Sequence, residues 1–453
     1  MAGQRKEDTS TSVVSEKENL KNLIADVLAE AKALGADTAE TAISTGSGLS
    51  VTVRLGEVET VEHNRDKGMG VTVYFGKRKG SASTTDYSAK AIKETVAAAC
   101  SIAKYTAEDN CAGLADPELM AREIPELDLY HPWDINAERA IDLARECEDV
   151  ARSLDSRITN SEGASLSSQQ GIRVYGNTHG FIEGYPTTRH SLSCAVISQE
   201  KNNMQRDYWY SSTRDKQDLE DPADIGRKAA QRALRRLNGR RLPTSQAAVI
   251  FSADIASGLI SSFIGAIRGG SLYRKTTFLL DSLGKQVFPS FVHITEQPHL
   301  KKALGSAPFD SEGVATHAHD IVREGVVQSY VLDTYSARKL GMQTTGNAGG
   351  VHNLIIDSGP NDLAGLMRKM DKGLFITELM GQGINRVTGD YSRGASGFWV
   401  ENGEIQFPVE EITIAGNLKD MFMGIIEIGN DVDLRHNIRT GSVLMEKLTI
   451  AGE

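Results

Sequence analysis

The sequence predicts an α+β protein with an N-terminal α/β domain, in which helices flank antiparallel strands, and a C-terminal domain dominated by antiparallel β-sheet. Two observations favour this fold class. Segments that alternate apolar and polar residues between short turns are typical of antiparallel strands with one buried face. Segments with apolar residues three and four positions apart predict helices, and most of these segments lie in the first half of the chain.

The first half of the chain mixes both patterns. A helix is predicted over residues 15–33, followed by an antiparallel meander over residues 38–84, with turns at Gly56 and at Gly68 and Gly70. The further predicted elements are helices over 88–106 and 134–154 and strand-like pieces over 171–177, 180–185 and 190–198. This pattern therefore predicts a sheet that is covered by helices.

A chain of 453 residues exceeds what one hydrophobic core usually organises, so we expect more than one domain. The stretch NGRRLPTS at 238–245 combines glycine, proline and charge, which is typical of a domain boundary. We therefore expect an N-terminal domain over residues 21–240 and a C-terminal domain over residues 245–453. Residues 1–20 are polar and charged, which predicts a disordered leader and not a secretory signal.

The C-terminal domain is expected to open with a buried strand at 247–251 and a helix over 254–270. Tight hairpins are predicted at 322–327 and at Asn402-Gly403, because Asn-Gly readily adopts the left-handed conformations of a two-residue hairpin turn. Glycine-punctuated strands dominate the remainder, so this domain should be mostly antiparallel sheet.

Charge and cysteine content disfavour several classes of function. The formal net charge of -10 disfavours non-specific binding to nucleic acid or to anionic membranes. No apolar run approaches the roughly 20 residues that cross a bilayer. The four cysteines lack C-x-x-C spacing, so neither a zinc knuckle nor a redox pair is indicated. We expect a cytoplasmic protein.

Two clusters of ionisable residues allow both a functional and a structural interpretation. The basic helix over 223–241 carries an apolar stripe at helical spacing, which predicts that its arginines lie on a solvated outer face. His317 and His319, beside Asp320, could begin a metal site. An alternating polar run next to a turn is, however, usually the solvent side of a hairpin.

The remaining candidates are serines and glycine-rich loops. No G-x-S-x-G motif occurs, and Ser261 and Ser262 lie inside the predicted helix, where a hydroxyl bonds to the preceding turn. The loops at 378–385 and 389–397 could admit an extended peptide along a sheet edge, although glycines also serve structural corners. The candidate peptide-groove residues are Gly381, Gly383, Gly389, Asp390, Arg393 and Gly394.

Several long motifs resemble one known family. They are RITNSEG at 157–163, FDSEGV at 309–314, SARKLG at 336–341, TELMGQG at 377–383, TGDYSRGASGFWVENGEI at 388–405, ITIAGNLKDM at 412–421 and GND at 429–431. Over nearly the whole chain after residue 20, the sequence is similar to the PmbA/TldE branch of the TldD/PmbA family, also described as the modulator of DNA gyrase family. The resemblance implies a two-subunit zinc metallopeptidase, in which the TldD-type subunit holds zinc through an H-E-x-x-x-H helix and a later cysteine.

In this sequence the metal motif is degenerate. The resemblance places the H-E-x-x-x-H window on Ser261-Ser262-Phe263-Ile264-Gly265-Ala266 and the later cysteine near Thr440 and Gly441. Zinc requires imidazole, thiolate or carboxylate donors, and a hydrolytic water requires a nearby base. Hydroxyl and methyl groups supply neither, so no catalytic residue, metal ligand or cofactor is expected in this chain.

The resemblance thus implies the non-metal subunit of a heterodimeric zinc peptidase, with the zinc supplied by a TldD-like partner. Its substrates would be unfolded peptides, in processes such as microcin leader removal and antitoxin degradation. An alternative is a non-proteolytic peptide-binding or regulatory protein that acts as a homodimer. A third possibility retains a metal at His317, His319 and Asp320.

Overall fold

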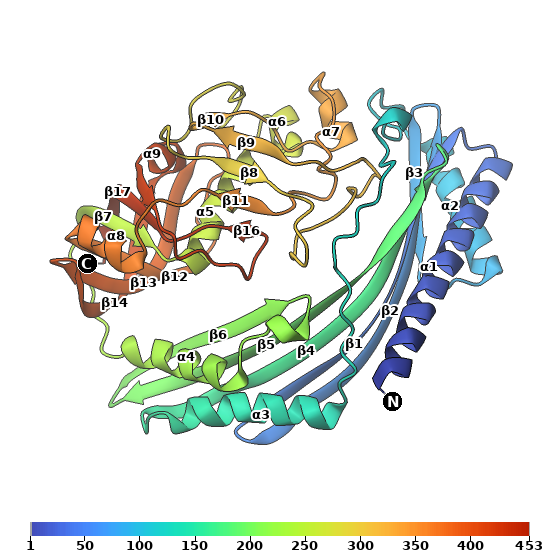
Figure 1. Cartoon of the computed structure of the whole chain (residues 1–453). Helices are drawn as coiled ribbons and strands as arrows, with labels where there is room; N and C mark the ends of the chain where they lie inside the picture. Colours follow the sequence, from blue (N-terminus) through green and yellow to red (C-terminus); the bar gives the residue numbers. More distant parts are fainter. Residues whose placement is uncertain (1, 453) are drawn as a thin grey trace.

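The computed structural model describes residues 2–452 and shows a strongly curved sheet whose concave side faces a β-rich C-terminal part (Figure 1). Helices cover the convex side of the sheet, and shorter helices accompany the C-terminal strands. The α+β fold class, with antiparallel strands and flanking helices first and a β-rich part second, is confirmed.

Six antiparallel strands form the curved sheet, in the order β3-β2-β1-β4-β5-β6. They are β1 (Thr38–Arg54), β2 (Glu57–Phe75), β3 (Arg78–Thr84), β4 (Ile158–Asn177), β5 (Ile182–Glu200) and β6 (Asn203–Thr213). Burial alternates along β1 and β5, because one face packs on helices and the other does not. The meander predicted over 38–84 corresponds to β1, β2 and β3.

One of the two predicted turns in this meander is wrong. Gly56 does lie in the β1–β2 turn, with φ of +83°. Gly68 and Gly70 lie inside β2, where they pair with β1, and Gly76 (φ +56°) makes the second turn. Glycine within a strand permits a tight bend, which fits the strong curvature of this sheet.

Four helices cover the convex face in two pairs (Figure 1). The helices are α1 (Ala2–Ala33) and α2 (Ala89–Tyr105) over one end, and α3 (Ala137–Ser153) and α4 (Pro222–Arg235) over the other. Ser88 caps α2 by accepting from the backbone N of Ala91, and Asn136 caps α3 by accepting from the backbone N of Arg139. These caps explain where the two helices predicted over 88–106 and 134–154 begin.

Helix α1 differs from the sequence-based expectation. We expected a disordered leader over residues 1–20, whereas α1 already begins at Ala2. From residue 20 onward the helix buries Leu20, Ile24, Val27 and Ala31 against the sheet. Burial of that apolar face holds the second half of α1, and the polar first half continues the same helix without an apolar signal that sequence analysis could use.

The C-terminal part is built on a small barrel and a second sheet. The barrel strands run in the order β14-β13-β12-β7-β17, and β14 also pairs with β17, which closes the ring. The barrel strands are β7 (Ser245–Phe251), β12 (Gly373–Met380), β13 (Asp390–Glu401), β14 (Glu404–Asn417) and β17 (Val443–Ala451), with β15 (Ile425–Ile428) added beside β17. All pairs in this sheet are antiparallel except β7 with β12.

The second sheet has the order β10-β9-β8-β11-β16. Its strands are β8 (Ile294–Glu296), β9 (His319–Arg323), β10 (Val326–Val327), β11 (Leu354–Ile356) and β16 (Ile438–Arg439). The helices of this part are α5 (Ala253–Ala266), α6 (Gly269–Tyr273), α7 (Thr334–Lys339), α8 (Leu363–Met370) and α9 (Leu418–Met423). Helix α5 contributes to the core that the barrel shares with the second sheet.

The predicted hairpins are present. Asn402 (φ +53°) and Gly403 (φ +73°) join β13 to β14, and Glu324 (φ +51°) and Gly325 (φ +75°) join β9 to β10. Two successive residues with positive φ match the right-handed twist of the flanking strands.

The two parts of the chain meet through an aromatic contact at one end of the concave face. Phe309 lies 5.1 Å from Phe181 and 5.5 Å from Tyr185, measured between ring centroids. Further along the sheet, the hydroxyl of Tyr210 on β6 lies 2.6 Å from Nε2 of His436. These contacts fix the C-terminal part over the curved sheet.

Candidate functional site

Helix α5 is the element on which the family resemblance places the metal motif. It follows β7 after a single residue and buries Leu259, Ile260 and Phe263 in the core between the two C-terminal sheets. Its other side carries small residues. A Cβ atom added to Gly258 or Gly265 would meet no atom within 4 Å, so this side of α5 is uncovered.

The three degenerate metal positions do not converge on one point. The hydroxyl of Ser262 donates to the carbonyl oxygen of Gly258 at 2.8 Å, the back-bond predicted for a helical serine. Ser261 is exposed, whereas Ala266, the last residue of α5, is 2% exposed and belongs to the core. Five residues advance about 140° around a helix, so Ser261 and Ala266 lie on different sides. These residues do not fit a zinc ion, either in donor chemistry or in placement.

The position of the later family cysteine lies next to α5 in space. Helix α5 packs beside β16, which directly precedes Thr440. Thr440 is fully buried and its hydroxyl donates to the carbonyl oxygen of Gly441 at 3.1 Å. A Cβ atom on Gly441 would lie 1.9 Å from the carbonyl oxygen of Gly429, so only glycine allows this close crossing. Neither residue offers a thiolate, imidazole or carboxylate donor.

The candidate peptide-groove residues gather around the loop that joins β12 to β13. Gly383 accepts a hydrogen bond from the backbone N of Ser392 at 2.7 Å, and a Cβ atom on Gly383 would lie 1.7 Å from the carbonyl oxygen of Ser392. Gly381 and Gly389 adopt φ of +78° and +85°. These three glycines therefore fold the loop back on β13, which is the structural-corner interpretation of the loop.

The charged candidates also stabilise this loop. Asp390 accepts from Thr388 Oγ1 at 2.6 Å and from Asn417 Nδ2 at 3.1 Å, and these bonds lower the pKa of the carboxyl group. The guanidinium of Arg393 donates to the carbonyl oxygen of Leu379 at 3.4 Å. Gly394 pairs across the sheet with Met380. The six residues are thus neighbours, but each makes contacts within the loop or its strands.

An open strand edge lies beside this loop. Strand β12 pairs with β7 only from Gly373 to Ile376, because β7 ends at Phe251 and the chain turns into α5. Beyond that point Glu378, Leu379 and Met380 pair with β13 alone. Within the described residues, no strand occupies the other edge of this segment, and α5 packs against β12.

The histidine pair of the sequence analysis does not form a three-ligand site. The rings of His317 and His319 do lie side by side, with centroids 5.2 Å apart. Asp320, however, is turned toward Arg323, whose Nε donates to it at 2.6 Å, and toward Thr295. Among residues 2–452, no group of three or more His, Cys, Asp or Glu side chains is arranged to hold a metal ion.

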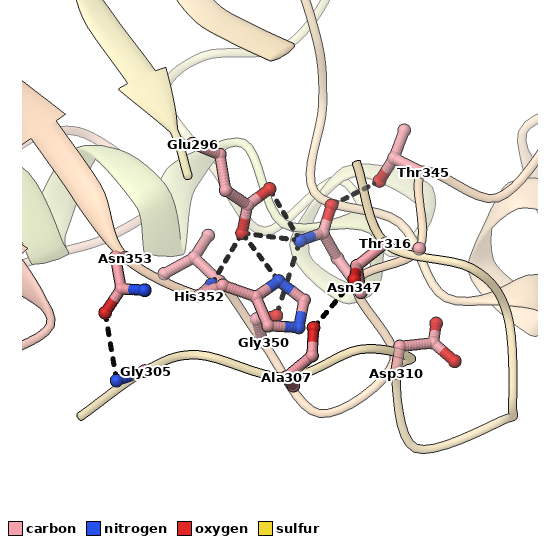
Figure 2. A network of polar contacts seen from close by, with 12 residues as sticks. Glu296, Gly305, Ala307, Asp310, Thr316, Thr345, Asn347, Gly350, His352 and Asn353 are labelled. Carbon is pink, nitrogen blue, oxygen red and sulfur yellow. Dashed lines mark hydrogen bonds and ion pairs between the residues drawn. The ribbon is translucent and has the colours of Figure 1, made fainter. Parts of the chain in front are cut away.

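His319 leads to a buried polar network that the sequence analysis did not identify (Figure 2). Glu296 on β8 is 1% exposed and accepts from Nδ1 of His352 at 3.0 Å and from Nδ2 of Asn347 at 3.0 Å. Nε2 of His319 lies 3.6 Å from the same carboxylate. Burial opposes ionisation, but the hydrogen bonds from His352 and Asn347 outweigh it and hold the pKa of Glu296 below its usual value.

No sequence pattern could have found this network, because Glu296 and His352 are 56 residues apart in the chain. The sheet brings them together, since β8 and β11 pair and His352 stands just before β11. In this Glu–His pair the ring of His352 bonds to Glu296 through Nδ1, and no ring hydrogen bond of His352 other than this one is formed within the described part of the chain.

Two carboxyl groups of the FDSEGV motif have raised pKa values. Burial raises the pKa of Asp310 to about 6, although the backbone N atoms of Glu312, Val314 and Ala348 donate to it. Burial and the nearby charge of Asp310 raise the pKa of Glu312 to about 7. Because both pKa values are higher in the folded chain than in the unfolded chain, the protonated forms favour the folded state. Their contribution to the free energy of unfolding is fully present below about pH 4 and is lost as the pH rises through 6 to 7.

Replacing Glu312 with glutamine is therefore expected to flatten the pH dependence of stability. The amide keeps an acceptor for the backbone N of Thr334 but cannot ionise. We expect the free energy of unfolding of the variant to match that of the native chain near pH 5 and to exceed it by about 1–2 kcal/mol at pH 8. Urea denaturation at pH 5 and pH 8 measures both values. Parallel pH profiles of the two proteins would contradict the assignment.

The arginines of the basic helix are not all solvated, contrary to prediction. Arg232 on α4 pairs with Asp207 at 3.0 Å and with Asp254 on α5 at 3.3 Å. Arg236 pairs with Asp207 at 3.4 Å and with Glu378 on β12. The two side chains are only 15% and 11% exposed. The apolar stripe predicts only which side of α4 packs on the sheet. The stripe does not indicate that the C-terminal part of the chain covers the side of α4 that carries Arg232 and Arg236.

Among the helices of residues 2–452, none combines the length and the apolar composition that a membrane span requires.

The chain is similar over three successive regions to the PmbA/TldA metallopeptidase domain 1 (residues 39–103), central domain (130–237) and C-terminal domain (244–452). It is 51% identical to the metalloprotease PmbA of Escherichia coli O157:H7 over 444 residues, which covers 97% of this chain and 99% of the relative.

Two solved structures share the fold. A crystal structure of a putative modulator of DNA gyrase from Bacteroides thetaiotaomicron matches with a TM-score of 0.91 at 29% identity, covering 96% of this chain and 99% of the other. TldE from Thermococcus kodakarensis matches with a TM-score of 0.84 at 21% identity, covering 95% and 100%. The chain therefore belongs to the PmbA/TldD metallopeptidase family.

Proposed function

We propose that this chain is the non-metal subunit of a heterodimeric zinc peptidase and that a TldD-type partner supplies the zinc. The observation that supports the proposal is the set of residues that α5 carries at the motif positions. The helix keeps its place between the two sheets, yet its motif positions are an exposed hydroxyl, a hydroxyl bonded to Gly258 and a buried methyl group. A chain with these groups cannot hold zinc at that place or activate a water there.

The substrate is proposed to be an extended, unfolded peptide. The free edge of β12 at Glu378–Met380 presents main-chain groups of the kind that an added peptide strand pairs with. The uncovered side of α5, with Gly258 and Gly265, leaves room for a main chain next to that edge. A folded substrate offers no free main-chain groups for such pairing.

A partner of the same family could meet this chain through a pseudo-twofold interface, because two homologous folds offer equivalent surfaces. The curved sheet provides such a surface. Residues Glu57–Lys67 of β2 pair with β1 on one side only and are exposed throughout. In the same way β6 pairs only with β5. Open strand edges of this length are commonly protected from further strand pairing, either by a covering element or by charged side chains. The exposed part of β2 carries several charged side chains.

The proposal is tested by mixing the purified chain with a TldD-type protein from the same source and following cleavage of an unstructured, fluorogenic peptide. We expect cleavage by the mixture to exceed that of the TldD-type protein alone by at least tenfold and to be abolished by a chelator. No gain on mixing would contradict the proposal and would favour the alternative, a homodimeric protein that binds peptides without cleaving them.

A further inference from the structure

A small cavity of about 180 Å³ lies where the concave face of the curved sheet meets the C-terminal part. Strands β4 and β5 contribute Arg173, Tyr175 and Tyr185. The C-terminal part contributes the remaining wall, which includes Phe309, Asp310, Ser311, Gly349, Gly350 and His352. None of these residues belongs to α5 or to the β12–β13 loop, so this cavity is separate from the site considered above.

The first feature that points to a ligand is the Glu296–His352 pair. His352 is 7% exposed, and the carboxylate of Glu296 accepts a hydrogen bond from Nδ1–H of its ring. In the neutral ring that donates from Nδ1, the other ring nitrogen, Nε2, is an acceptor, and Figure 2 shows it on the side of the ring away from Glu296. Because His352 lines the cavity, this acceptor is available to a bound molecule.

The second feature is an unpaired positive charge. The side chain of Arg173 is exposed and makes no ion pair with any described residue. Its only hydrogen bond to a described residue is a long one, 3.5 Å from Nη1 to Ser311 Oγ. Ser311 and Tyr185, which also carry hydroxyl groups, line the cavity from the C-terminal part and from β5 respectively. The one carboxylate in the cavity, Asp310, has its oxygens engaged by three backbone N atoms. The free groups therefore favour an anion.

We propose that this cavity binds the C-terminal residue of a peptide, with its carboxylate on Arg173 and its main-chain N–H on Nε2 of His352. The last residue of a peptide is the group that carries both a carboxylate and an adjacent N–H donor. Phe309 and Tyr175 give the cavity an apolar lining for its side chain. Gly349 and Gly350, which also line the cavity, have no side chains to occupy it, and their positive φ angles of +103° and +122° favour glycine at both positions.

This inference rests on the proposed function in so far as it names the end of the peptide that the subunit holds. The test measures binding to the purified full chain by fluorescence anisotropy, without a partner and without cleavage. The probe is an unstructured, N-terminally labelled hexapeptide that ends in leucine with a free carboxylate. Three further probes carry a C-terminal amide, a C-terminal amide with glutamate as the last residue, and a free carboxylate with an N-methylated last peptide bond.

We expect the free-carboxylate peptide to bind about tenfold more tightly than its amide, since a charge-assisted hydrogen bond of this kind contributes about that factor. The N-methylated peptide should lose at least about threefold, because it has no N–H for His352. Arg173→Gln should reduce binding of the free carboxylate to the level of the amide. Arg122→Gln, which changes another exposed arginine outside the cavity, should leave binding unchanged.

Equal binding of the acid and amide peptides, or an Arg173→Gln variant that binds as the native chain does, would overturn the inference. Tight binding of the amidated glutamate peptide would assign the cavity to acidic side chains and would also overturn the assignment to chain ends. The proposed function is tested by a different measurement, the cleavage of a peptide by the mixture. It can therefore fail or hold independently of these binding curves.

Discussion

Replacing Phe263 with alanine is expected to lower the free energy of unfolding of the C-terminal part by about 3–5 kcal/mol. Phe263 is fully buried, and its ring centroid lies 4.9 Å from that of Phe288 and 6.0 Å from that of Phe422, in edge-to-face contacts. The variant would lose the buried apolar surface and these aromatic contacts, and it would leave a cavity between the two sheets. Guanidinium denaturation, followed by circular dichroism and tryptophan fluorescence, measures the loss.

The matched control for this variant lies two residues earlier on the same helix. Ser261 is exposed and its hydroxyl makes no hydrogen bond to a described residue, so Ser261→Ala should change the free energy of unfolding by no more than about 0.5 kcal/mol. Together the two variants separate the two sides of α5. A large effect at Ser261, or a small one at Phe263, would contradict burial of the Phe263 side of α5 and exposure of its Ser261 side.

Replacing Asp207 with alanine is expected to cost about 3–5 kcal/mol, because it leaves two largely buried guanidinium groups without their shared partner. The carboxylate of Asp207 is 4% exposed and bridges Arg232 and Arg236. These arginines also pair with Asp254 on α5 and Glu378 on β12, so the loss should loosen the contact between the curved sheet and the barrel.

The control for Asp207→Ala is an exposed ion pair of the same sheet. Glu162 and Arg206 form a contact with side chains 45% and 48% exposed, and Glu162→Ala should cost no more than about 1 kcal/mol. Limited proteolysis of both variants reports the contact between the two parts directly. We expect faster cleavage between α4 and β7, at residues 236–244, in Asp207→Ala only. Equal cleavage rates would contradict a role of this network in holding the two parts together.

The helices and hairpins could be predicted where local rules decide the structure. Helical periodicity and the caps at Ser88 and Asn136 place α2 and α3, and Asn402-Gly403 sets a hairpin turn by its backbone preference. The turn predicted at Gly68 and Gly70 is wrong because glycine is usually found in the turns between strands. Here both glycines lie inside β2, where glycine permits the strand to bend.

Contacts between distant segments could not be predicted. The ion pairs of Arg232 and Arg236 depend on where the barrel docks, and the Glu296–His352 pair depends on how β8 and β11 pair in the second sheet. For α5, the residue types at 261, 262 and 266 already argue against a zinc site. The structure adds that Ala266 is turned into the core, which the hexapeptide alone does not reveal.

We expect that the residues of this chain do not assemble a zinc peptidase by themselves, and the isolated polypeptide shows whether this is so. The chain is purified without a partner, incubated with excess zinc, desalted, and assayed for bound metal and for cleavage of an unstructured peptide with and without a chelator. We expect less than about one tenth of a zinc ion per chain and no chelator-sensitive cleavage, since Ser261, Ser262 and Ala266 offer no imidazole, thiolate or carboxylate donor. One zinc ion per chain together with cleavage that the chelator abolishes would contradict it.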